Sequence, residues 1–187
     1  MNNNRVKAFG NFISTRNTVR GLVLALATLV ISGTVSAQVN NNAAQEATLK
    51  FRGGIGVIPV TGVAANGAAN LNVVRGVTPG APCRIEDLAA DIAADGHIHV
   101  VGRGLLLASG NGIGSNAGQR VHVTLFCGAA TSATAHSSTL AGVPLESDGD
   151  FRIDDFLSPI PQGTCTTPVL LVQNAGDVWF AAGIPKQ

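Results

Sequence analysis

The chain has 187 residues, 12% of them charged, 45% hydrophobic and 23 of them glycine, and its formal net charge at pH 7 is +1. The hydrophobic fraction excludes intrinsic disorder, and the length suits one domain with its own core. Charged residues occur at about half their usual share. Together with the abundant glycine, this composition favours secreted β structure with tight turns over a helical bundle.

The first 37 residues predict a secretory signal peptide. Four basic residues and no acidic ones come first, an apolar run follows at 21–31, and Val35 and Ala37 suit the −3 and −1 positions of a cleavage site. The apolar run is too short to span a bilayer, although an uncleaved N-terminal anchor is the alternative. We therefore expect export to the periplasm or the medium, no transmembrane segment after cleavage, a flexible leader at 38–48 and a folded domain at 49–187.

Cleavage would change the sign of the net charge. The predicted signal peptide holds four of the twelve basic residues and none of the eleven acidic ones, so the mature chain has a net charge of −3. A weakly acidic chain without a basic cluster is a poor candidate for binding nucleic acid or an anionic membrane. The partner is unknown at this stage, and an envelope component or another protein fits best.

The folded domain begins with β-forming residues that are broken by glycine and proline. Pro59 cannot donate to a β-ladder, so residues 49–63 should form an edge strand or two shorter strands. Residues 64–69 (AANGAA) predict a turn, and 71–77 predict a short strand.

Residues 84–94 are ambiguous between helix and strand. They contain good helix formers with apolar spacing, but Asp95-Gly96 follows at once, and this pair is a strong hairpin signal. We favour a strand that pairs with 97–107, with a helix of one to two turns as the alternative. The run 105–108 is apolar on both faces and predicts a central position in a sheet.

The second half of the domain alternates in the manner of strands. Expected strands lie at 119–127, 138–145, 150–153, 168–173 and 178–182, with a loop at 129–138 and a turn at Asp148-Gly149. Trp179 and Phe180 point to opposite faces, and one of them should enter the core. Seven to nine strands with turn signals between them predict an all-β domain, a two-layer antiparallel β-sandwich.

Three cysteines remain after the predicted export to an oxidising compartment, so one disulfide is expected. Cys127 ends one expected strand and Cys165 precedes another, which favours a bond between these two. Pairing of Cys83 with either of them is the alternative, because three cysteines allow three choices.

A glycine loop at 110–115 imitates the start of a dinucleotide-binding fingerprint. That motif requires a third glycine where Ser115 stands and a helix after it, whereas a strand pattern follows here. We expect the loop to connect two strands without binding a ligand.

Three of the four histidines suggest a metal site. His97 and His99 share one face of a strand, and His122 belongs to the next long strand. We favour exposed histidines on a strand face, and a site in which the three bind zinc or copper is the alternative. Without this cluster, no cofactor is expected.

Other catalytic signals are weak. Five of the eleven acidic residues fall within 146–155, without the order of ligands in an EF-hand, so a solvated hairpin is expected there. Serine, histidine and aspartate occur without a nucleophile elbow or another activating motif. No catalytic residue is therefore assigned.

Two segments resemble known secreted domains. SDGDFRIDDFL (147–157), a turn followed by an F-x-I strand, is similar to a segment of immunoglobulin-like and prealbumin-like accessory domains. CTTPVLLVQNAGDVWFAAGIP (165–185) is similar to the closing hairpin of secreted bacterial proteins of unknown function. The resemblance implies an exported immunoglobulin-like β-sandwich and no particular activity.

The sequence therefore predicts an exported, non-enzymatic β-sandwich that acts as a binding or envelope-associated module. One alternative is a periplasmic protein that binds zinc or copper through its histidine cluster. Another is a structural surface protein that assembles through edge strands, suggested by the broken stretch 49–63.

Overall fold

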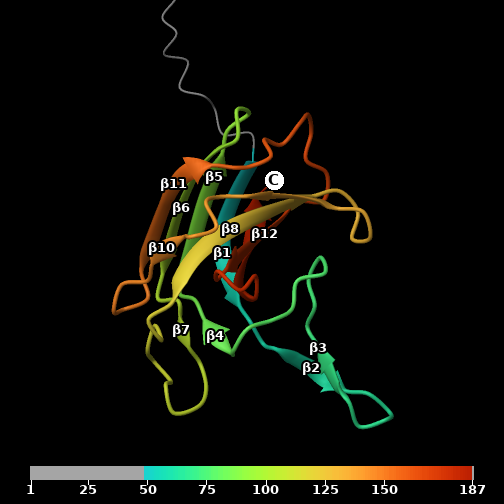
Figure 1. Ribbon diagram of the computed structural model, residues 1–187, viewed down its shortest axis with the longest axis vertical. Coiled ribbons are helices and arrows are strands. Elements are labelled where there is room, and N and C mark those ends of the chain that lie inside the picture. Colours follow the sequence, from blue (N-terminus) through green and yellow to red (C-terminus); the bar gives the residue numbers. More distant parts are fainter. Residues whose placement is uncertain (1–48, 187) are drawn as a thin grey trace, which may run out of the picture. The chain divides into compact units, whose positions relative to one another are not determined.

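The structure, a computed structural model, describes residues 49–186, and all regular structure in this range is β-strand (Figure 1). The expected signal peptide at 1–37 and leader at 38–48 lie outside the described residues, as does residue 187. Within the described range, no helix is long and apolar enough to cross a membrane.

Thirteen strands make up this part of the chain. In order they are β1 (Leu49–Gly56), β2 (Val60–Val63), β3 (Ala69–Leu71), β4 (Cys83–Arg84), β5 (Asp87–Ile92), β6 (His97–Arg103), β7 (Leu106–Leu107), β8 (Arg120–Cys127), β9 (Thr134–Ser137), β10 (Val143–Pro144), β11 (Phe151–Phe156), β12 (Val169–Gln173) and β13 (Trp179–Lys186). Nine of them form one sheet in the order β10-β8-β12-β13-β1-β5-β6-β11, with β9 also paired to β8. β2 pairs only with β3, and β4 only with β7. Every strand pairing is antiparallel, which confirms the expected all-β, antiparallel class.

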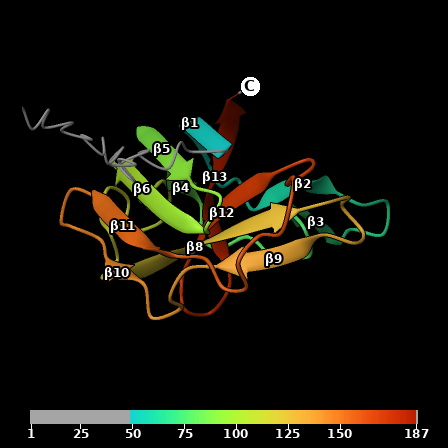
Figure 2. The same cartoon turned by 90° about the horizontal axis from the view of Figure 1, so that it is seen from above.

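The nine-stranded sheet rolls up until its two ends meet (Figure 2). β10, at one end of the strand order, lies against β11 at the other. Nearby, Ser137 and Ser158 exchange two backbone hydrogen bonds of 2.9 and 2.8 Å, which connect β9 to the segment after β11. The backbone N–H of Thr139 donates to the Asp155 carboxylate at 2.7 Å. We call this junction the seam.

The core lies inside the rolled sheet because alternate residues of its strands point inward. In β5, for example, the buried residues Leu88, Ala90 and Ile92 alternate with more exposed ones. Burying a large aliphatic or aromatic side chain contributes about 1.5–3 kcal/mol, so these rows dominate stability. The largest fully buried apolar side chains are Phe51, Leu88, Ile92, Ile98, Leu105, Leu125, Leu157, Leu170, Leu171, Val57 and Val100.

A second apolar layer forms on the outside of the sheet around β13. The Trp179 indole N–H donates to the carbonyl of Asn72 at 3.1 Å, and the backbone of Trp179 bonds to Thr78 and Gly80. The segment 72–80 is thereby held along β13. As a result, Trp179 and Phe180 are both buried, whereas the sequence placed only one of them in the core.

The structure decides the two stretches that had alternative predictions, residues 84–94 and 49–63. None of residues 84–94 is helical, since most of them form β5 and Arg84 ends β4, and Gly96, at φ 85°, makes the turn into β6. A side chain other than glycine is strained at that φ, which is why Asp-Gly was the deciding signal. The stretch 49–63 forms two strands separated around Pro59, which confirms one of the two predictions. The other, an edge strand, is wrong, because β1 is a central strand between β13 and β5.

Several expected strands were wrong in extent. In 138–145 only β10 is a strand, partly because the N–H of Thr139 bonds to a carboxylate instead of a ladder. Conversely, β9 lies within the expected loop 129–138. Of 71–77 only Leu71 is in a strand, although Val74 and Val77 form an isolated bridge.

The apolar run 105–108 does not lie centrally in the large sheet. The strand breaks at Gly104, which has φ 63°, and β7 pairs with β4 instead of continuing β6. Leu105 and Leu106 are nevertheless buried, so burial outside the large sheet explains their character. The glycine loop that follows connects β7 to β8, as expected.

Candidate functional site

Two of the three histidines considered for a metal site lie side by side on the outward face of β6. His97 and His99 alternate with the buried Ile98 and Val100, and Asp154 of β11 lies directly across the strand pair. The Nε2 atom of His97 is 2.6 Å from one oxygen of Asp154, and Nδ1 of His99 is 4.0 Å from the other. The Asp154 carboxylate therefore hydrogen-bonds to His97 and lies near His99.

This histidine pair belongs to a charged row across four strands. The register places Lys50, Asp91, His99 and Asp154 next to one another on β1, β5, β6 and β11. Arg52 adds an ion pair to Asp91 at 2.7 Å. These side chains are all partly exposed, and ion pairs of this kind contribute about 0–1 kcal/mol each. The row is a solvated polar face, not a water-excluded reaction centre.

His122 lies elsewhere, on β8, with 1% of its surface exposed. Its cross-strand neighbour is Gln173, and Oδ1 of Asp177 is 3.7 Å from its Nε2 atom. Neither ring nitrogen of His122 has a hydrogen-bond partner among the described residues. Burial lowers the pKa of His122, and the charge of Asp177 opposes that shift. The ring is therefore neutral near pH 7.

The three-histidine metal cluster, the alternative to exposed histidines, is not formed in the described range. No group of three or more His, Cys, Asp or Glu side chains between residues 49 and 186 could hold a metal ion. The sequence placed His122 beside His97 and His99 because their strands are consecutive long strands. In the sheet, however, β12, β13, β1 and β5 separate β8 from β6 in one direction, and β10 and β11 lie between them across the seam. The zinc or copper alternative loses the geometry on which it depended.

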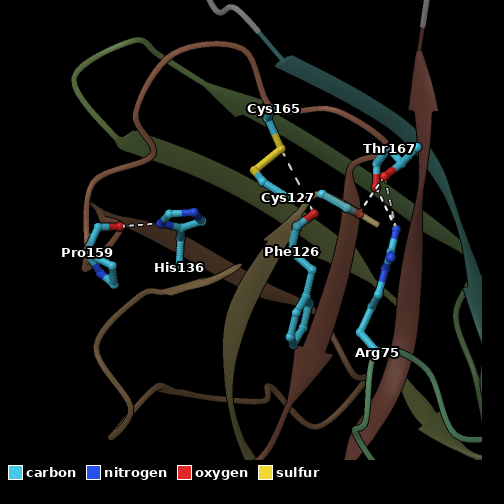
Figure 3. The surroundings of a disulfide bond; sticks show 8 residues. Arg75, Phe126, Cys127, His136, Pro159, Cys165 and Thr167 are labelled. Atoms are coloured by element: carbon cyan, nitrogen blue, oxygen red, sulfur yellow. Dashed lines mark hydrogen bonds between the residues drawn. A yellow bond between two sulfur atoms is a disulfide. The ribbon is translucent and has the colours of Figure 1, made fainter. Parts of the chain in front are cut away.

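The disulfide joins Cys127, at the end of β8, to Cys165, which precedes β12 (Figure 3). This is the favoured one of the three possible pairings. Around it, the Thr167 hydroxyl donates to the carbonyl of Gly128 at 2.5 Å, and Arg75 donates to the carbonyl of Thr167 at 2.8 Å. The bond therefore anchors the long crossover between β11 and β12.

Cys83 has a free and buried thiol. Burial raises its pKa to about 11, because a thiolate is poorly solvated there. The thiol is the form present near neutral pH, and the thiolate is the reactive one. Cys83 is therefore a packing residue.

A cavity of about 350 Å³ lies beside the disulfide, at the end of the sheet where β1 begins. Its lining comes from β1, the β5–β6 turn and the crossover: Leu49, Ile92, Ala93, Ala94, Pro161, Gly163, Thr164 and Cys165. None of these side chains is charged, and the Thr164 hydroxyl has no acidic or basic side chain beside it in the lining. The cavity offers apolar contact and no catalytic chemistry.

The acidic residues of 146–155 mostly bind backbone N–H groups. Asp150 accepts from Gly104 at 3.0 Å, and Asp155 accepts from Thr139 at 2.7 Å and from Phe156 at 2.8 Å. Burial raises the pKa of Asp155, but these hydrogen bonds lower the pKa by a larger amount, so the net shift is downward. Asp155 thus holds the seam and Asp150 holds the chain just after β6, and the two carboxylates bind different backbone groups instead of converging on a cation.

A groove of about 370 Å³ follows the seam. Its walls are hydroxyl groups and two apolar side chains: Ser137, Ser138, Thr139, Leu140, Phe156 and Ser158. Phe156 is 56% exposed, and its ring lies 5.1 Å from the ring of His97. Phe156 therefore lies both in the groove and beside His97, but the described side chains show no nucleophile paired with a base in the groove.

The most exposed apolar feature is the β2–β3 hairpin, which projects from the rolled sheet (Figures 1 and 2). We call residues 58–73 the arm. Every residue from 60 to 71 is exposed. The large apolar side chains Ile58, Val60, Val63, Leu71 and Val73 are 42–72% exposed, and no charged residue occurs between 53 and 74.

A β-bulge gives the arm one apolar face. Val60 pairs with Leu71 and Val63 pairs with Ala69, with an irregularity between Val60 and Gly62. Directly paired residues share a face, and Ala69 and Leu71 lie on the same face of β3. Val60 and Val63 therefore also share that face. In a regular strand, two residues three positions apart would point to opposite faces.

Sequence reasoning missed the arm as a functional feature. It identified the AANGAA turn and the break at Pro59, but it assigned 71–77 as a strand of the main domain. The available signal was a turn flanked by uncharged apolar residues. Neither the bulge nor the exposure of these residues can be read from that pattern.

The two segments that carry the resemblance to secreted domains fold as β-structure. Residues 147–157 contain the turn before β11 and β11 itself, and 165–185 contain the β12–β13 hairpin. Comparison with protein-family models, with curated proteins and with solved structures gives no match. The resemblance therefore stays a prediction.

Proposed function

We propose that this chain is an exported, non-enzymatic binding module of the cell envelope, and that the arm is its interaction surface. The apolar face of the arm carries the proposal. Val60, Val63 and Leu71 lie on one side of a two-stranded ribbon that nothing in the described chain covers. Contiguous apolar surface that remains exposed and is presented on a projecting element is typical of an interaction site.

The physical cost of leaving the arm uncovered supports this interpretation. An isolated two-stranded hairpin is marginally stable in water, and apolar burial contributes about 25 cal/mol per Å². A partner that covers the face would stabilise the arm and gain affinity from the same contacts. The solvated histidine row and the uncharged end cavity offer no comparable driving force.

The rolled sheet provides the scaffold for the arm, and we propose that its architecture is an immunoglobulin-like β-sandwich. Its halves β10-β8-β12-β13 and β1-β5-β6-β11 share one core and are joined through the β13–β1 pair. The pattern of residues 1–37 and the disulfide between Cys127 and Cys165 both suit an oxidising compartment.

Site-specific photocrosslinking in cells that export the full chain tests the binding function. A photoreactive residue at position 63, on the apolar face, should give a discrete adduct of higher mass. The matched control is position 70, because Asn70 pairs with Gly62 and lies on the opposite face. Equal labelling from both positions, or no adduct from position 63, would refute the arm as the binding surface.

Intact mass of the exported protein tests the localisation. Cleavage after Ala37 should leave a chain that begins at Gln38, found in the periplasm or the medium. An uncleaved chain that sediments with membranes would instead support the N-terminal anchor.

A further inference from the structure

We propose that the arm binds the arm of a second copy of this chain, so that two identical apolar faces pack against each other about a twofold axis. This inference rests on the proposed function, because it names the partner of the same surface. The protein would then form a reversible dimer through its arm, and the rolled sheet would have the same structure in monomer and dimer.

The first argument is the geometry of the face. Val60 and Leu71 form one cross-strand pair and Val63 and Ala69 the next, which gives a short row of apolar side chains on one side. The opposite side carries Asn70. A twofold axis brings each surface against its own copy, so an interface of this kind must be self-complementary. A smooth apolar row meets this condition without requiring any matched donor or acceptor.

The second argument is charge. In a twofold interface, a charged residue near the axis lies close to the same charge on the partner, and like charges directly opposite are destabilising. Nothing between residues 53 and 74 is charged, although Arg52 and Arg75 flank the stretch closely. Two arms can therefore approach without electrostatic repulsion between their contact residues.

The third argument separates a protein partner from a lipid bilayer. Segments that insert at a membrane surface typically carry tryptophan or tyrosine at the interface and lysine or arginine beside it. The arm contains none of these four residue types. Its opposite face carries Asn70 instead, which suits a ribbon that is covered on one side and solvated on the other.

The size of the arm sets the strength of the contact. A standard stable interface takes about 20–30 residues from each partner. The arm spans residues 58–73, and only part of it lies on the apolar face. We therefore expect a weak, concentration-dependent equilibrium between monomer and dimer, not a permanent dimer.

Sedimentation velocity of the exported, disulfide-bonded chain tests the proposal. The wild type should shift from monomer to dimer as its concentration rises. Val63→Lys places a charge on the apolar face and should weaken association by about tenfold or more. Asn70→Lys adds the same charge to the opposite face of the same hairpin and should leave association unchanged. Thermal unfolding verifies that each variant folds.

A charge-reversal pair gives an independent readout. Val63→Lys and Val63→Glu should each be monomeric alone, and an equimolar mixture should form a heterodimer. This rescue requires the two copies of residue 63 to lie near each other. A strictly monomeric wild type at all concentrations, or equal loss with Val63→Lys and Asn70→Lys, would overturn the inference.

Two further outcomes separate this inference from the proposed function. If position 63 crosslinks to a different protein in cells while the pure chain stays monomeric, the binding function stands and self-association is wrong. If the pure chain binds phosphatidylcholine vesicles and Val63→Lys abolishes that binding, the face recognises lipid and self-association is also wrong.

Discussion

His122 is a fully buried imidazole whose ring nitrogens have no hydrogen-bond partner in the described part of the chain. Such a group is tolerated only in its neutral form, because an imidazolium would lose its hydration without gaining a close partner. Asp177, at 3.7 Å, compensates in part. The energetic consequence of this one side chain is a dependence of stability on pH.

We predict that the protein loses stability as the pH falls below about 6.5. Burial lowers the pKa of His122 in the folded state, whereas the unfolded chain has the ordinary value of 6.5. The unfolded state therefore binds the proton first, and the free energy of unfolding decreases by at most about 1.4 kcal/mol per pH unit from this group. Urea unfolding at a series of pH values between 7.5 and 5 measures this slope.

Two variants assign the slope to His122. His122→Gln should flatten it in this range, whatever its effect on stability at pH 7.5. Asp177→Asn removes the charge that opposes the shift, so the loss of stability should extend to lower pH. Asn is compatible with the φ of 55° at this position. A wild-type slope that persists in His122→Gln would assign the pH dependence to another group.

At the scale of elements, short-range signals predicted individual strands well. Asp95-Gly96 identified the β5–β6 hairpin against a competing helical pattern, and the alternation of 119–127 identified β8. The failures arose where a long-range contact decides the outcome. The N–H of Thr139 bonds to Asp155, sixteen residues away, and a strand pattern cannot reveal that.

The pairing of β6 with β11 depends on a glycine that faces the core. Gly102 lies opposite Phe151, and a Cβ atom at Gly102 would collide with the Phe151 ring. We predict that Gly102→Ala lowers the free energy of unfolding by about 1–3 kcal/mol, the usual cost of overpacking a core. Chemical denaturation monitored by circular dichroism measures the change.

A double-mutant cycle supplies the control for Gly102. Phe151→Leu alone should destabilise the protein, since it removes buried volume. Combined with Gly102→Ala, it should cost less than the sum of the two changes, because the smaller side chain makes room for the new methyl group. Simple additivity would show that the two positions do not share the space.

The disulfide acts on the crossover between β11 and β12. The bond closes a loop with a sequence separation of 38, and in the chain-entropy model a loop of this length stabilises by about 3–4 kcal/mol. We predict that replacing both Cys127 and Cys165 by serine lowers the free energy of unfolding by about this amount. Reduced wild type should behave like the double variant.

The third cysteine provides the matched comparison. Cys83→Ala should keep the disulfide. Reduction should lower its free energy of unfolding by the same amount as it lowers that of the wild type. Because the Cys83 thiol is buried with its pKa raised to about 11, it should resist alkylation in the folded protein. A mixture of disulfide isomers after refolding would contradict its inert role.

At the scale of the whole molecule, the sequence predicted the class of fold but not the arrangement of the site. His97 and His99 are neighbours because alternation within one strand is a local property. Whether His122 joins them depends on strand order, which places other strands between β6 and β8 in both directions around the rolled sheet. The arm escaped prediction for a related reason, since one extra residue at the bulge decides which side chains share a face.

The exposure of residues 60–71, the part of the arm outside the contact with β13, gives the last prediction. The N–H of Asn72 donates to the carbonyl of Pro59 at 2.8 Å, so the two ends of 60–71 are already close together. Replacing 60–71 by a two-residue Asn-Gly turn should leave the free energy of unfolding within about 0.5 kcal/mol of wild type, since no residue of that range is buried. The same variant should be monomeric in sedimentation at concentrations where the wild type dimerises. If deletion instead unfolded the sheet, the exposed arm would be a folding element, and its apolar face would need another explanation than binding.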